Sequence, residues 1–79
     1  MEELERVALT EDISEHGLRA GDIGMIAHIY NDHKGYEVEF VTLSGDLIAL
    51  VSVYPNQIRP LESDEIANAR RVKSGNTLI

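Results

Sequence analysis

The chain has 79 residues, a formal net charge of −7 and no cysteine. A chain of this length forms one small domain with little room for a deep pocket, and the lack of cysteine excludes disulfides and thiolate metal sites. The longest apolar run, residues 47–53, is far shorter than the ~20 residues that span a bilayer, and the acidic N-terminal residues are unlike a basic secretory leader. We therefore expect a cytoplasmic protein without a membrane span.

The negative charge is concentrated in the first part of the chain. Residues 1–61 contain eleven acidic and four basic residues, whereas residues 62–79 contain three of each. A field of this sign repels phosphate backbones and favours basic partners, and it also keeps a small protein in solution. We predict two units from this division, a folded domain over residues 1–61 and a helical or flexible extension over residues 62–79.

Five short strands are predicted in the first unit, with a long polar loop between the first two and one helical turn before the last. The predicted strands cover residues 6–9, 22–30, 36–42, 47–53 and 58–61. In the second strand the apolar residues do not alternate strictly, which indicates a β-bulge. The third strand alternates clearly, since Tyr36, Val38 and Phe40 are separated by Glu37 and Glu39, and this pattern is typical of a half-buried strand. These elements predict a mainly β fold, a small five-stranded SH3-like barrel.

Glycines at turns and at close contacts between strands support this architecture. We assign structural roles to Gly17, Gly21, Gly24, Gly35 and Gly45. The strand over residues 47–53 is apolar on both faces, so we expect one face to lie on the core and the other to be covered by another element.

A short C-terminal helix is predicted over residues 64–73. Ser63 can cap it, acidic residues lie in the first turn, basic residues lie in the last turn, and Gly75 can end it. A helix of about ten residues is too short to be stable alone, so its Ile66, Ala69 and Val72 would need a surface. That surface is either the second face of the strand over residues 47–53 or another chain; otherwise the extension is a flexible tail.

A family resemblance rests on residues spread over three quarters of the chain. It is carried by Val7-Ala8-Leu9, Gly17-Leu18, Gly21-Asp22-Ile23-Gly24, Gly35-Tyr36-Glu37-Val38-Glu39-Phe40, Gly45 and Gln57-Ile58-Arg59-Pro60-Leu61. Through these residues the segment 5–61 resembles a small bacterial family known only as a domain of unknown function. The resemblance implies an SH3-like barrel and no particular activity. The Gly-Asp-x-Gly opening is also similar to barrel strands of RNA-binding ribosomal and transcription-factor modules and, more distantly, of the nitrile hydratase β-subunit.

Catalytic and metal-binding patterns are not found in the sequence. His16, His28 and His33 lack the spacing of paired metal ligands, and the serines have no histidine in a nucleophile setting. Alternating charges such as Glu37 and Glu39 are those of a solvated strand face. The glycines of residues 17–24 lack the Lys-Ser/Thr ending of a phosphate loop. We predict a protein that is not an enzyme and that uses no metal and no cofactor.

The predicted function is a non-catalytic acidic protein-interaction module, an accessory, antidote or immunity-type partner of another bacterial protein. The candidate partner-binding residues are Glu11, Asp12, Glu15, Glu37 and Glu39. The partner is a basic protein, a larger chain or a second copy that forms a homodimer. The alternative is a nucleic-acid-associated barrel that uses Arg19, Lys34, Arg59 and the tail bases, which the net charge disfavours. Recognition of proline-rich peptides is disfavoured because the chain has no tryptophan.

Overall fold

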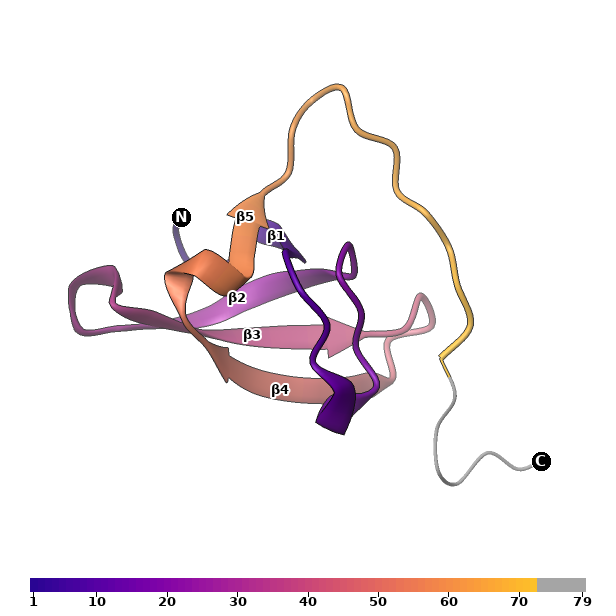
Figure 1. Ribbon diagram of the computed structural model, residues 1–79, viewed down its shortest axis with the longest axis horizontal. Helices are drawn as coiled ribbons and strands as arrows, with labels where there is room; N and C mark the ends of the chain where they lie inside the picture. The colour runs from indigo at the N-terminus through magenta and orange to yellow at the C-terminus, as the bar shows by residue number, and fades with distance from the viewer. Residues whose placement is uncertain (73–79) are drawn as a thin grey trace.

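The computed structural model describes residues 1–72 and contains five antiparallel strands in one sheet (Figure 1). The strands are β1 (Arg6–Leu9), β2 (Ile23–Tyr30), β3 (Gly35–Val41), β4 (Leu47–Val53) and β5 (Ile58–Pro60). Their order is β4-β3-β2-β1-β5. The predicted mainly β fold is confirmed, but β4 and β5 are the two edges of an open sheet, and its closure into a barrel is not seen in the part of the chain that is described.

The strands lie where the alternation of apolar and polar residues predicted them. Tyr36, Val38 and Phe40 of β3 are at most 3% exposed, whereas Glu39 between them is exposed. The predicted bulge of the second strand is confirmed, because the register of β2 with β3 shifts between Ile26 and His28. The predicted helical turn before the last strand is the 3-10 turn η3 (Pro55–Gln57), which places proline where its missing N–H is harmless.

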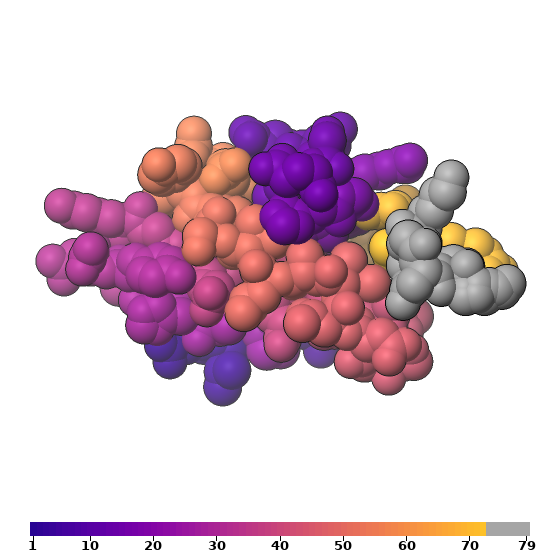
Figure 2. Space-filling view, turned by 90° about the horizontal axis from the view of Figure 1, so that it is seen from below, coloured from indigo at the N-terminus to yellow at the C-terminus, as the bar shows by residue number. Residues whose placement is uncertain are grey.

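One face of the sheet is covered by the loop between β1 and β2. This loop contains the 3-10 turn η1 (Ser14–His16) and returns on itself through a bridge between Ile13 and Leu18. Both side chains are buried in the same cluster as Val38, Val51 and the rest of the core. The loop crosses one face of the sheet (Figure 1), and its atoms lie against those of β4 (Figure 2). The core is therefore enclosed between the sheet and this loop.

The predicted C-terminal helix is wrong. Residues 64–72 contain no helix, and residue 73 lies outside the described part. A segment of about ten residues does not form a stable helix without a surface to pack against, and Ile66 of the predicted apolar stripe is 92% exposed. The outer face of β4 is consequently not covered by a helix, and Leu50 on it is 49% exposed.

Among residues 1–72, no helix has the length and apolar character needed to cross a membrane.

Gly24 lies on β2 at the closest approach of this strand to core side chains of β3. A Cβ atom at this position would lie 2.6 Å from Cγ1 of Val38 and 2.8 Å from Cε1 of Phe40. Carbon atoms in favourable contact are about 3.5–4.0 Å apart. Any side chain at this position would therefore displace two buried residues.

We expect Gly24→Ala to lower the free energy of unfolding by about 1–3 kcal/mol, because the added methyl group overpacks the core. Gly35→Ala is the matched control, since a Cβ atom there has its nearest neighbour at 3.5 Å, and we expect a change within about 0.5 kcal/mol. Urea denaturation followed by circular dichroism measures both. Equal losses for the two variants would contradict the close-packing role of Gly24.

Candidate functional site

Three of the acidic candidates lie on the loop between β1 and β2, and two of them already make hydrogen bonds. Oδ1 of Asp12 accepts a hydrogen bond from the backbone N–H of Ala20 at 2.9 Å. Oε2 of Glu11 accepts one from Nε2 of Gln57 at 3.2 Å. Glu15 is exposed within η1. These carboxylates help to hold the loop in shape, and each keeps free acceptor capacity for a partner.

The other two candidates lie on β3 and point away from the core. Glu37 and Glu39 alternate with the buried residues of this strand, and neighbouring side chains of a strand point to opposite faces. In the sheet register Glu39 lies between Met25 of β2 and Leu50 of β4. We call this surface the outer face and define it by Met25, Glu37, Glu39 and Leu50.

Apolar and basic groups adjoin the outer face. Val41 and Leu47 are register partners at the end of the β3–β4 hairpin and are 49% and 60% exposed. Arg6 of β1 is paired with Met25 and is exposed, so one positive charge lies in the same row as Glu39. The outer face thus combines carboxylates with exposed apolar side chains on a rigid sheet.

The structure does not bring the five acidic candidates into one surface. The loop that carries Glu11, Asp12 and Glu15 covers the core on one side of the sheet, with Ile13 and Leu18 buried beneath it. The outer face lies on the other side. Two separate acidic surfaces result, and a single partner contact of ordinary size, about 800 Å² on each protein, would use mainly one of them.

A buried or clustered metal site is not formed by the histidines. Within residues 1–72, no group of three histidine, aspartate or glutamate side chains is placed to hold a metal ion. His28 packs edge-on against Tyr30 with ring centroids 4.8 Å apart, and Nε2 of His33 lies 3.4 Å from a carboxylate oxygen of Glu2.

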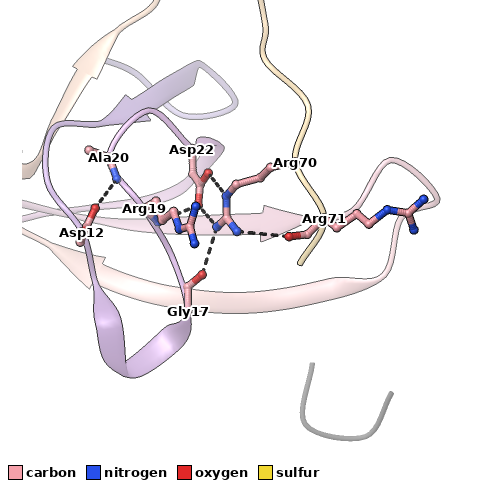
Figure 3. Close-up of polar contacts among 7 residues, drawn as sticks. All are labelled: Asp12, Gly17, Arg19, Ala20, Asp22, Arg70 and Arg71. Carbon is pink, nitrogen blue, oxygen red and sulfur yellow. Dashed lines mark hydrogen bonds and ion pairs between the residues drawn. The ribbon is translucent and has the colours of Figure 1, made fainter. Parts of the chain in front are cut away.

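A second arrangement joins the tail to the loop (Figure 3). Nε of Arg70 donates to Oδ1 of Asp22 at 2.8 Å, and Nη2 donates to Oδ2 of the same carboxylate and to the carbonyl oxygen of Gly17 at 3.0 Å. Oδ2 of Asp22 also accepts the backbone N–H of Arg19 at 2.8 Å. This is a bidentate arginine–carboxylate pair, which is stronger and more directional than a single charged hydrogen bond.

The pair is partly shielded from water and changes the acidity of Asp22. The exposed fractions of the two side chains are 26% for Arg70 and 18% for Asp22. Burial alone would raise the pKa of Asp22, but hydrogen bonds from the Arg70 side chain and the Arg19 amide, with the charges of both arginines, lower it below its ordinary value of 3.8. The carboxylate is therefore charged over the whole neutral range.

The beginning of the tail is held by another arginine. Nη1 and Nη2 of Arg59 donate to the two carboxylate oxygens of Glu65 at 2.8 and 2.6 Å, and Glu65 also accepts the backbone N–H of Glu62. The hydrogen bonds from Arg59, followed by that from Glu62, lower the pKa of Glu65 to about 2. The tail is thus attached to the folded part at two arginines.

The pattern of charges along the tail predicted a helix end for Arg70 and did not indicate its pairing with Asp22. The two residues are 48 positions apart, so no local spacing relates them. The one feature of the sequence that favours such a pairing is the excess of acidic residues in residues 1–61. It makes every basic residue of the tail a candidate to pair with one of them and does not single out Arg70.

Comparison with known proteins identifies one family. Residues 3–60 match the model of the family described as "Domain of unknown function (DUF4926)". The match spans the whole sheet and ends at the last residue of β5, so it does not include the tail. No curated protein and no solved structure matches the chain.

We expect the Asp22–Arg70 pair to stabilise the protein only where Asp22 is ionised. Its pKa is lower in the folded state than the ordinary value of 3.8, so the contribution is present above that pH and is lost as the pH falls through the folded value. At neutral pH, Arg70→Ala should lower the free energy of unfolding by about 0.5–1 kcal/mol. Asp22→Ala should cost more, about 1–3 kcal/mol, because the Arg19 amide also loses its acceptor.

Urea denaturation as a function of pH measures this difference, with Arg71→Ala as the control because no hydrogen bond is formed by the Arg71 side chain among the described residues. The gap between the wild type and Arg70→Ala should close below pH 3.8. A gap that stays constant down to a much lower pH would contradict the assignment.

Proposed function

The chain belongs to the DUF4926 family of domains of unknown function, and we propose that it is a non-catalytic protein-interaction module that binds a basic partner protein. The observation that carries the proposal is the outer face. There Glu37 and Glu39 of β3 adjoin the exposed Leu50 of β4, and the opposite face of β3 lies in the core. In finer detail we propose an SH3-like barrel, located in the bacterial cytoplasm, that acts as an accessory, antidote or immunity-type partner.

The composition of the outer face supports binding to a protein. Exposed apolar side chains supply the area that is removed from water in an interface, and the carboxylates beside them orient a partner of opposite charge and accelerate its association. Because Glu37 and Glu39 extend from a strand that is paired on both sides, their positions are set before binding. Preformed surfaces lose less conformational freedom on association.

The overall charge supports a basic partner. The net charge is −7, and a field of this sign attracts cationic surfaces over about 10 Å at ordinary salt concentrations. A small acidic scaffold of this kind is complementary in charge to the surface of a basic enzyme, which is the reason for the antidote or immunity proposal.

The nucleic-acid alternative receives less support from the arrangement of the bases. Arg59 is paired with Glu65 and Arg70 is paired with Asp22, so two of the bases on which the alternative depends are already neutralised. Phosphate backbones are bound by unpaired lysine and arginine side chains that release counterions. The protein-interaction proposal therefore stands first.

Charge reversal on the outer face tests the proposal. We expect Glu37→Lys with Glu39→Lys to fold normally, because neither carboxylate is buried, and to retain at most about a tenth of the partner captured by the wild type, since close interfacial charges contribute ~1.5 kcal/mol or more. The measurement is affinity capture from a native lysate at low salt, with the captured basic protein identified and its binding quantified with purified components.

The matched control is Glu62→Lys with Asp64→Lys, which changes the net charge equally on the exposed beginning of the tail. It should bind the partner like the wild type, apart from a modest loss through the overall field. Equal loss in both variants would show that only net charge matters. Unchanged binding of the outer-face variant would refute the proposal.

A further inference from the structure

Among residues 62–72, the tail is held to the body of the protein by two ion pairs, Glu65 of the tail with Arg59 and Arg70 of the tail with Asp22. After β5 the chain arches away from the sheet and returns near the loop between β1 and β2 (Figure 1). Residues 62–69 are all exposed, with Ile66 at 92%. Ordering such a segment costs conformational entropy, and its returning end is held to the loop by Arg70.

The site that receives Arg70 is built by the loop alone. Its three acceptors are the two carboxylate oxygens of Asp22 and the carbonyl oxygen of Gly17. Asp22 is oriented by the Arg19 amide, and Gly17 adopts the left-handed conformation, φ +69°, that ends η1. The hydrogen bond from Arg19 to Asp22 and the conformation of Gly17 are both made within the loop, without any residue of the tail.

The loop around the site has an independent anchor and lies beside a surface hollow. The hydrogen bond from the Ala20 amide to Asp12 closes the loop beside Asp22 (Figure 3). A surface hollow of about 370 Å³ is lined by Asp12, Ser14, Gly17, Leu18 and Arg19 together with Arg70 and Arg71 of the tail. The hollow therefore lies between the loop and the tail, and Arg70 forms part of its wall.

We propose that Asp22 and Gly17 form an arginine-binding site, that an arginine in an extended segment of a partner protein binds there, and that Arg70 is a tethered competitor for it. The inference rests on the proposed function, because it names the chemistry by which a basic partner is recognised at a second surface. The planar guanidinium matches the two carboxylate oxygens and the carbonyl, whereas the single ammonium of lysine cannot bridge all three in the same way.

Tethering gives the site a regulatory property. Arg70 is connected to β5 by a short chain, so its effective concentration at the site is in the millimolar range. A partner must displace it, and the apparent dissociation constant of the partner equals the intrinsic one divided by the fraction of time for which the site is free of Arg70. Binding of a partner arginine would release the tail, and the tail would become available for contacts of its own.

The test uses the full chain and a synthetic peptide of residues 66–70, acetylated and amidated, as the arginine probe. Binding is followed by amide chemical shifts of Gly17 and Asp22 at low salt. We expect Arg70→Ala to bind the probe about tenfold more tightly than the wild type, which is the ratio for a site that is occupied nine-tenths of the time. Arg71→Ala is the matched control and should bind like the wild type.

Two further measurements define the site. The same peptide with lysine in place of arginine should bind Arg70→Ala at least about threefold more weakly. Adding Asp22→Asn to Arg70→Ala should abolish binding, while dispersed amide shifts show that the double variant is folded. Equal affinity of the wild type and Arg70→Ala, equal binding of the two peptides, or binding that survives Asp22→Asn would each overturn the inference, as would no binding to Arg70→Ala.

Failure here is distinguishable from failure of the proposed function. The peptide titration does not involve Glu37 or Glu39, and the capture experiment varies only these two residues. If the peptide does not bind but partner capture still depends on the outer face, the arginine-binding site alone is refuted. If the reverse holds, the outer face is refuted as the partner surface.

Discussion

The apolar face of the open sheet must be shielded from water, and the other features of this protein depend on which segment of the chain covers it. No α-helix is present in residues 1–72, so the loop between β1 and β2 provides the cover. Ile13 and Leu18 enter the core from this loop and are 7% and 4% exposed. Removing such side chains from water is the main favourable contribution that a small domain can make to its own stability.

The covering loop also determines where the two candidate surfaces lie. The apolar residues of the loop are turned into the core, so its backbone and its acidic residues form the outer rim. On this rim Asp12 closes the loop, and Asp22 and Gly17 bind Arg70. Because the loop lies on one side of the sheet, it leaves the opposite side uncovered. Glu39 and Leu50 remain on that side, in register with each other. Both candidate surfaces thus follow from the packing of this loop against one face of the sheet.

The exposed tail fits this arrangement. Ile66 of the tail is 92% exposed, and no helix forms over residues 64–72 to cover the outer face of β4. The tail is instead attached through charged side chains, Arg59 with Glu65 and Arg70 with Asp22. Contacts of this kind are individually weak and depend on salt and pH, so an attachment made from them can be exchanged for a partner without disturbing the core.

The sequence by itself determined the strands, because alternation within β3, the proline before β5 and the turn residues act over a few neighbouring positions. It also indicated the bulge of β2 and an acidic folded part. Three features were decided only by the tertiary structure. They are the open order of the strands, the separation of Glu11, Asp12 and Glu15 from Glu37 and Glu39, and the absence of a helix in residues 64–72. The pairing of Arg70 with Asp22 across 48 positions belongs to the same group. Such features depend on which distant segments pack against the same surface, and the pattern of neighbouring residues in the sequence does not indicate this.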